Sequence, residues 1–165
     1  LDRADVIIVT RRRAAIAESH RLTARIAARW PGAVVASLHL AVEGLRGLRT
    51  GGRVGLALLA RKRVVVAAGI ADPASFAAQV RASGATVQLM AYQDHHPYPA
   101  GDVARLALAA KDADYVVVTE KDAVKLRNRW PADAPEPLVA ELALHWELNG
   151  DAVERVLEEV LKRVV

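Results

Sequence analysis

Short apolar runs alternate with segments of helical periodicity along this 165-residue chain, and that alternation limits the fold more than any other feature. The run Val64–Ala68 is continuously apolar, as strands of a parallel sheet are when helices cover both of its faces. The other predicted strands cover residues 5–9, 33–40, 86–92, 115–118 and 138–144. Because strands that alternate with helices form mostly parallel sheets, the sequence predicts an α/β fold, a mostly parallel sheet flanked by helices. We expect residues 1–165 to form a single domain.

Several helix boundaries are marked by residues that favour helix ends. Asp72 followed by proline is typical of a helix start, and Gly84 is typical of the position just after a helix end. Ser19 is expected to cap another helix. The inward face of that helix is predicted to consist of Leu22, Ile26 and Ala27. Further helices are predicted near residues 101–110 and 151–164.

The segment from residue 43 to residue 55 interrupts this pattern with five glycines and three arginines. Such a Gly/Arg-rich segment is typical of a loop or a hairpin, and we expect it to be the most flexible part of the chain. Its stretch Gly47–Val54 has the glycine spacing of a phosphate-binding loop. However, Arg53 replaces the lysine and Val54 replaces the Ser or Thr of that motif. We therefore do not interpret it as a nucleotide-binding loop.

Composition excludes several classes of protein. Cysteine is absent, which rules out disulfide bonds and thiolate metal sites. No apolar run approaches the roughly 20 residues that span a bilayer, so the chain itself is expected to be soluble. Residues 1–63 carry 13 Lys and Arg against 4 Asp and Glu, which suits an anionic partner or a solvated basic surface. Aromatic residues make up only 4%, so no nucleic-acid partner is expected.

Polar segments at residues 69–73, 94–96 and 119–125 each follow a predicted strand. Ligands of open α/β sheets bind beyond the carboxyl ends of the strands, so we expect these segments to converge on one crevice. A carboxylate beside an imidazole can fix its tautomer and raise its basicity. We therefore predict a functional role for His95, with loop capping as the alternative, whereas His96 is expected to pack. No metal site is predicted, because neighbouring strand residues point to opposite faces.

The third of these segments is a strand-to-helix turn. Either Thr119 or Asp122 is expected to cap the helix. A lysine near a helix N-terminus is locally unfavourable, so Lys121 is interpreted as facing an anionic group outside the helix. Lys125 lies four residues further along the same face. An ordinary capped helix with a solvated lysine is the alternative.

Four blocks resemble segments of the tetraacyldisaccharide 4'-kinase family, in the same order and at similar spacing. Ala67–Phe76 resembles the segment AGI-[GA]-[ND]-P-x-x-F, and Asp94–Tyr98 resembles D-H-H-x-[YF]. Thr119–Leu126 is nearly identical to TEKDAVKL, and Arg3–Thr10 is similar to R-A-D-x-[IV]-[IV]-V-[TN]. The resemblance covers this whole chain but only the C-terminal part of the enzyme, and the chain starts with Leu1 instead of Met. We therefore interpret it as a fragment that lacks the N-terminal half with its Walker A loop.

The resemblance implies an ATP-dependent kinase that phosphorylates the 4'-hydroxyl of a tetraacyldisaccharide 1-phosphate, giving lipid IVA in lipid A biosynthesis. It also implies a P-loop-kinase-like fold, with ATP and Mg²⁺ as cofactors. The implied partners are the glycolipid substrate and the N-terminal half of the same enzyme, with peripheral association at the cytoplasmic face of the bacterial inner membrane. His95 would belong to the catalytic dyad, with Asp94 orienting it. The residues placed near substrate or phosphate are Thr119, Lys121, Asp122 and Lys125.

Because the Walker A half is missing, we expect this chain alone to be inactive. Two other classes of protein remain open. A DHH-type phosphoesterase needs several Asp/His motifs around two metal ions, and this sequence contains one such motif. The second alternative is a non-catalytic, Rossmann-like binding domain.

Overall fold

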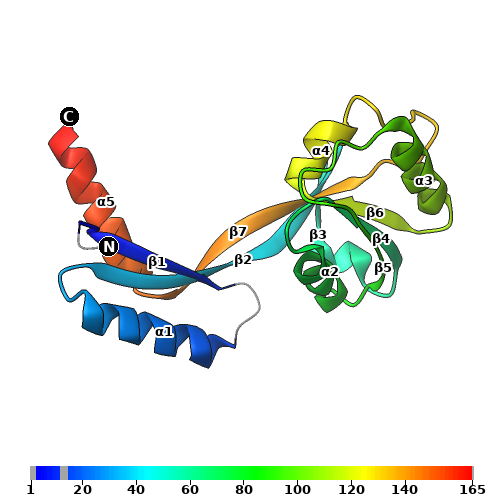
Figure 1. Ribbon diagram of the computed structural model, residues 1–165. Helices are drawn as coiled ribbons and strands as arrows, with labels where there is room; N and C mark the ends of the chain where they lie inside the picture. The colour runs from blue at the N-terminus through cyan, green and yellow to red at the C-terminus, as the bar shows by residue number, and fades with distance from the viewer. Residues whose placement is uncertain (1–2, 12–14, 165) are drawn as a thin grey trace. The chain divides into compact units, whose positions relative to one another are not determined.

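The structure, a computed structural model, describes residues 3–11 and 15–164. Its strands are β1 (Val6–Arg11), β2 (Val34–Gly47), β3 (Arg53–Gly55), β4 (Arg63–Ala68), β5 (Thr86–Ala91), β6 (Tyr115–Val118) and β7 (Leu138–Leu148). Its helices are α1 (Ile16–Arg29), the 3-10 helix η1 (Leu56–Leu59), α2 (Pro73–Ala82), α3 (Ala100–Lys111), α4 (Glu120–Leu126) and α5 (Gly150–Val164). The strand order is β1-β2-β7-β6-β4-β5, with β3 paired to β2 (Figure 1).

The sheet is mostly parallel. The pairs β1–β2, β4–β5, β4–β6 and β6–β7 are parallel, whereas β2–β3 is antiparallel. Helices are interspersed between the strands along the chain, and α2 packs against both β4 and β5. The predicted α/β fold is therefore confirmed.

The chain divides into two compact units. Unit 1 consists of Leu1–Ala41 and Ala143–Val165, and unit 2 consists of Val42–Leu142. Both long strands, β2 and β7, contribute residues to each unit. The boundaries of the two units therefore fall inside these strands. The single domain expected from the chain length stays a prediction.

Strand β4 lies between β5 and β6 in unit 2 and is buried on both sides. Successive residues of a strand point to opposite faces, so its side chains enter two different cores. Val65 and Ala67 join the core that includes α3 and α4, whereas Val64, Val66 and Ala68 join the core that includes α2. All five are at most 2% exposed. This two-sided burial explains the continuously apolar run, and the predicted strand is confirmed.

The predicted helix ends in unit 2 are also confirmed. The Asp72 carboxylate accepts a 3.0 Å hydrogen bond from the Ser75 N–H at the start of α2. After that helix, Gly84 has a φ of 88°, a conformation that glycine adopts without steric cost. At the start of α4 the Thr119 hydroxyl oxygen accepts from the Asp122 N–H at 3.2 Å. Sequence signals at helix ends are therefore reliable in this unit.

The Gly/Arg-rich segment 43–55 forms a β-hairpin, one of the two structures expected for it. In its turn the Arg49 and Thr50 N–H groups donate to the Glu136 carboxylate, and the Thr50 hydroxyl donates to it at 3.1 Å. Burial by itself would raise the pKa of Glu136, but the hydrogen bonds from Thr50 and Arg49 outweigh it and lower the pKa. These amides bind an internal carboxylate, which agrees with rejecting the segment as a phosphate-binding loop.

Helix α1 of unit 1 differs from its prediction. It begins at Ile16, before the expected Ser19 cap, and its buried residues are Ser19 and Thr23. The Thr23 hydroxyl donates to the Ser19 carbonyl at 2.9 Å, which satisfies this buried polar group. Leu22 is 45% exposed and Ala27 is also exposed, whereas Ile26 is half-buried, so the predicted inward face was wrong for two of its three residues. The buried side of the helix, which packs on β1, therefore includes two short polar side chains.

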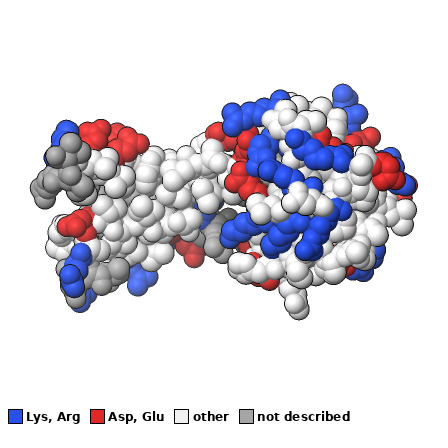
Figure 2. Space-filling model, turned by 90° about the horizontal axis from the view of Figure 1, so that it is seen from above, with Lys and Arg blue, Asp and Glu red and all other residues white. Residues whose placement is uncertain are grey.

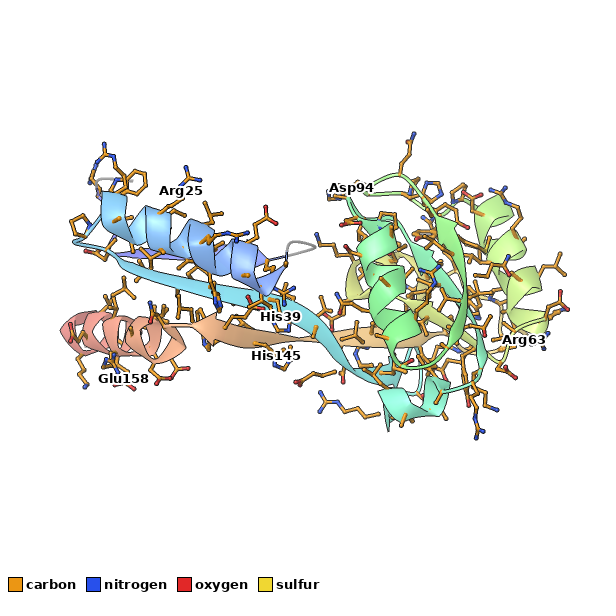
Figure 3. All side chains as sticks on the ribbon, turned by 90° about the horizontal axis from the view of Figure 1, so that it is seen from below. Arg25, His39, Arg63, Asp94, His145 and Glu158 are labelled. Atoms are coloured by element: carbon orange, nitrogen blue, oxygen red, sulfur yellow. The ribbon has the colours of Figure 1, made fainter. Side chains whose placement is uncertain are left out.

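A polar cluster links the strands of unit 1. Glu147 of β7 lies 2.7 Å from Nε and 2.5 Å from Nη2 of Arg11 on β1. Its Oε1 is 2.9 Å from Nδ1 of His39 on β2, and the rings of His39 and His145 stack with centroids 5.1 Å apart (Figure 3). The hydrogen bond from Arg11 is the main reason that the pKa of Glu147 is lowered. The cluster therefore connects three strands through one carboxylate.

Helix α5 has a pronounced apolar side. Val153 is buried, whereas Leu157, Val160 and Leu161 are 54%, 50% and 65% exposed. Within the part of the chain that the structure describes, no helix combines the length and apolar character needed to cross a membrane.

Candidate functional site

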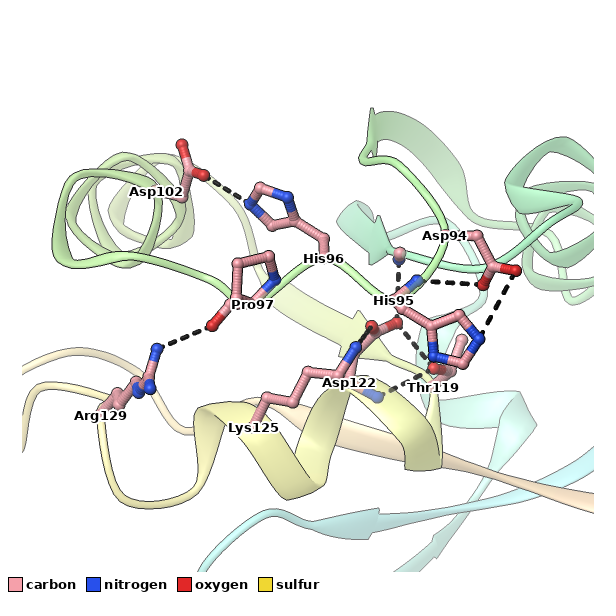
Figure 4. Close-up of polar contacts among 10 residues, drawn as sticks. Asp94, His95, His96, Pro97, Asp102, Thr119, Asp122, Lys125 and Arg129 are labelled. Atoms are coloured by element: carbon pink, nitrogen blue, oxygen red, sulfur yellow. Dashed lines mark hydrogen bonds and ion pairs between the residues drawn. The ribbon is translucent and has the colours of Figure 1, made fainter.

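Three segments meet beyond the carboxyl ends of β4, β5 and β6, and Figure 4 shows their polar contacts. The N–H of Gly69, directly after β4, donates to Oδ2 of Asp122 in α4 at 3.1 Å. The carbonyl of Gly69 accepts from the N–H of His95, in the segment after β5, at 3.1 Å. The expected convergence of these segments is therefore observed within unit 2, with Gly69 as their common contact.

Asp122 is a buried residue that contacts two parts of this site. Its exposed fraction is 0%, and its Oδ2 accepts a 2.7 Å hydrogen bond from the Thr119 hydroxyl in addition to the one from Gly69. Its Oδ1 has no hydrogen-bond partner among the described residues and lies 3.9 Å from Nζ of Lys125. The sequence placed Asp122 near substrate or phosphate. In this structure the carboxylate is completely buried, and its role toward substrate stays a prediction.

His95 combines a constrained backbone with an accessible ring. Its φ is 61°, in the left-handed region that non-glycine residues adopt at an energetic cost. Residues held in such conformations are often found at functional sites. Its N–H is bonded to Gly69 and also faces Asp94 Oδ1 at 3.1 Å. The imidazole is 81% exposed, with its Nε2 3.8 Å from Asp94 Oδ2, within ion-pair range of a protonated ring. This geometry presents an imidazole that can exchange a proton with a ligand.

His96 points into the unit instead. Its Nε2 lies 2.6 Å from Asp102 Oδ2, and its ring stacks on Tyr92 with centroids 4.7 Å apart. Asp102 also accepts a hydrogen bond from Arg105. This bond from Arg105, and then the one from His96, lowers the pKa of Asp102. The packing role expected for His96 agrees with these contacts.

Basic side chains gather near α4. Figure 2 shows Lys and Arg on the upper face of unit 2, the side on which α4 lies in Figure 1. Lys121 is exposed, whereas Lys125 is half-buried, with its Nζ 5.9 Å from the centre of the Tyr98 ring. Burial, followed by the charge of Asp122, raises the pKa of the Tyr98 phenol, so this group stays neutral. Lys121 is therefore accessible to an anion from solvent, whereas the Lys125 ammonium lies near Asp122 and the Tyr98 ring.

The residues missed by sequence reasoning lie in the packing around His96. Tyr98 is completely buried beside His96, with ring centroids 5.0 Å apart and a φ of 52°. Its place in the Asp94–Tyr98 block was a signal for it. Asp102 gave no comparable signal, because an acidic residue in the first turn of a helix is commonplace.

The described residues contain no group of metal ligands, and amides of the glycine-rich turn are already hydrogen-bonded. In residues 3–11 and 15–164, no three His, Asp or Glu side chains are grouped so that they can bind one metal ion. The glycine-rich turn has its amides bonded to Glu136, as described above. The accessible polar groups of the site include His95, Asp94 and Lys121.

A mostly parallel sheet with its polar site beyond the carboxyl ends of neighbouring strands defines an α/β protein of the kind that binds ligands at that edge. Residues 1–162 match the sequence profile of one particular family, LpxK, described as tetraacyldisaccharide-1-P 4'-kinase. The chain belongs to this family.

Curated relatives have the same description. The tetraacyldisaccharide 4'-kinase of Nitrobacter winogradskyi is 37% identical over 132 residues, which cover 76% of this chain and 39% of that protein. The enzyme of the same name from Rhodopseudomonas palustris strain TIE-1 is 48% identical over 67 residues, 39% of this chain and 20% of that protein. The alignments thus span about two fifths or less of the length of these relatives.

A solved structure resembles the whole chain. The crystal structure of the "apo" form of LpxK from Aquifex aeolicus in complex with ATP has a TM-score of 0.56 and 13% sequence identity. The match covers 95% of this chain and 52% of that one. At this identity the likeness supports the fold.

Proposed function

We propose that this chain is the C-terminal part of an ATP-dependent kinase that phosphorylates the 4'-hydroxyl of a tetraacyldisaccharide 1-phosphate, giving lipid IVA. Membership of the family and the names of the relatives support this reaction. The observation that carries the proposal is His95, an exposed imidazole in a constrained backbone where three family-like segments meet.

Phosphoryl transfer depends mainly on positioning and on charge stabilisation. In the proposed reaction the 4'-oxygen attacks the γ-phosphorus, the bond to the β–γ bridging oxygen breaks, ADP leaves and the hydroxyl proton passes to a base. We propose that His95 takes part in this proton transfer together with an aspartate from the N-terminal half. Asp94, whose Oδ2 lies 3.8 Å from His95 Nε2, would orient the ring, and Lys121 would attract phosphate.

ATP and Mg²⁺ do not fit the described residues by themselves, since these supply neither a complete metal site nor available glycine-loop amides. We propose that the N-terminal half of the enzyme binds both groups and that the present chain alone has no kinase activity. The glycolipid would then meet the enzyme peripherally at the cytoplasmic face of the inner membrane. The basic side chains near α4 support such an anionic partner.

A chimera tests the proposal. Residues 1–165 replace the matching segment of the Nitrobacter winogradskyi enzyme, and transfer of radioactive phosphate from ATP to tetraacyldisaccharide 1-phosphate is measured. We expect a 4'-phosphorylated product from the chimera and none from residues 1–165 alone. A folded chimera without activity would contradict the proposed function. Kinase activity in the isolated chain would contradict the expectation that residues 1–165 are inactive alone.

A second variant covers the case in which the chimera does not fold. Only Ala67–Phe76, Asp94–Tyr98 and Thr119–Leu126 are then transferred into the same relative. These segments contain the groups around His95, so the proposal requires that this variant retains activity. Loss of activity in a variant that still melts cooperatively would contradict it.

A further inference from the structure

Asp122 and His95 belong to different segments but share one intermediary, the peptide group of Gly69. Asp122 Oδ2 accepts from the Gly69 N–H at 3.1 Å, and the Gly69 carbonyl accepts from the His95 N–H at 3.1 Å. A buried carboxylate is therefore connected to the backbone of the exposed histidine through two hydrogen bonds.

There is also little room for a side chain at Gly69. A Cβ at this position would lie 3.1 Å from Asp122 Oδ1, 3.1 Å from His96 Cβ and 3.2 Å from the Gln93 carbonyl oxygen. Asp122 and the segment that carries His95 thus enclose Gly69 together. A displacement of the carboxylate is transmitted to this segment, because packed groups leave little room for independent movement.

The carboxylate is itself held in one orientation. The Thr119 hydroxyl donates to Oδ2 at 2.7 Å, and Lys125 Nζ lies 3.9 Å from Oδ1. Because the carboxyl group is completely buried, water cannot replace a lost partner, so the loss of any of these contacts is costly. The contacts therefore select one position for Gly69 and, through it, for His95.

We propose that Asp122 is a positioning residue for His95. This inference rests on the proposed function for its catalytic consequence. It assigns to Asp122 a role that its buried position permits: it fixes the left-handed backbone of His95, and hence the direction of the imidazole, without touching substrate. Group positioning of this kind contributes strongly to rates when the reacting atoms must be aligned.

Amide hydrogen exchange in residues 1–165, followed by NMR, tests the structural link. We expect Asp122→Asn and Thr119→Val to accelerate exchange of the Gly69 and His95 amides roughly fivefold or more, as for the loss of one hydrogen bond. Thr119→Ser keeps the hydroxyl and is expected to keep the protection. Asp133→Asn, at an exposed position, is the matched control.

A merely structural role predicts a different pattern. If Asp122→Asn accelerates exchange of the core strands β4 and β6 as much as that of Gly69 and His95, the variant only destabilises unit 2 and the proposal is overturned. Unchanged exchange of Gly69 and His95 overturns it as well.

The catalytic consequence is measured in the kinase chimera. Asp122→Asn is expected to lower kcat roughly tenfold or more, with KM for the glycolipid little changed, whereas Asp133→Asn keeps kcat. A kcat equal to that of the control overturns the proposal. An inactive parent chimera contradicts the proposed function alone, because the exchange pattern still decides whether Asp122 positions His95.

Discussion

At the scale of single residues, Gly69 is where three segments of the site come into contact. A Cβ there would meet Asp122 Oδ1 and His96 Cβ at 3.1 Å, whereas a Cβ at Gly101, in the same unit, has open space. We expect Gly69→Ala to lower the free energy of unfolding by about 1–3 kcal/mol through overpacking. Gly101→Ala lies in α3 and is expected to raise it by about 0.5–1 kcal/mol. Urea denaturation measures both, and equal stabilities would contradict the packing described for Gly69.

Glu136 gives a prediction about pH. Hydrogen bonds from the hairpin turn outweigh burial and lower its pKa from 4.5, so its ionised form stabilises the folded state. This contribution is complete above the unfolded pKa and is lost as the pH falls through the lower, folded pKa. We expect Glu136→Gln to lower stability by about 1 kcal/mol at pH 7, and the difference from the parent to vanish in acid.

Thermal melts between neutral and acidic pH measure this difference, with the exposed Glu158→Gln as the control. The control should follow the parent at every pH. A Glu136→Gln difference that persists unchanged at low pH would show that the charge of Glu136 is not its cause.

At this scale the sequence indicated which residues are reactive, but it did not indicate how deeply they are buried or which groups they contact. His95 was recognisable, because an Asp-His pair at a strand end is a combination of residue types suited to proton transfer. The burial of Asp122 could not be recognised from the sequence, since an acidic residue is expected at the surface unless it is paired. Thr119 lies three residues before it in the same turn, but its other partner, Gly69, follows β4, and only the folded chain brings Gly69 and Asp122 together.

At the scale of secondary-structure elements, local capping determines where α2 begins. The Asp72 carboxylate accepts from the Ser75 N–H, which would otherwise lack a partner within the helix. We expect Asp72→Ala to destabilise the chain by about 1 kcal/mol, whereas Asp72→Asn keeps the acceptor and loses a few tenths. Urea denaturation distinguishes the two. Equal stabilities of the Ala and Asn variants would show that the cap does not contribute.

Elements whose ends are not marked by capping residues were predicted less accurately. β2 has 14 residues and continues past Gly44, where the glycines indicated a loop or a hairpin but not the length of the strand. Its pairing with β3 provides a partner that strand propensity alone does not show. The buried face of α1 is formed by Ser19 and Thr23, so hydrophobicity did not identify it. Tertiary packing decides both features.

At the scale of the whole molecule, unit 2 contains complete hydrophobic cores. Both clusters of buried residues lie entirely within 42–142, although β2 and β7 also contribute to unit 1. We therefore expect a fragment of residues 42–142 to fold alone, because a domain requires its own core. Circular dichroism and NMR should show helix content, dispersed amide signals and a cooperative transition. A fragment without cooperative unfolding would show that unit 2 depends on unit 1.

The most direct test of the central claim, that this chain supplies His95 to a lipid A 4'-kinase site, is the rate of 4'-phosphorylation by a His95→Ala chimera. Removing a residue active in proton transfer typically costs about 100-fold or more. We expect such a loss with an unchanged melting temperature, because the ring is 81% exposed, while His20→Gln in α1 of unit 1 keeps the parent rate. A His95→Ala enzyme that is as active as its parent would contradict the account.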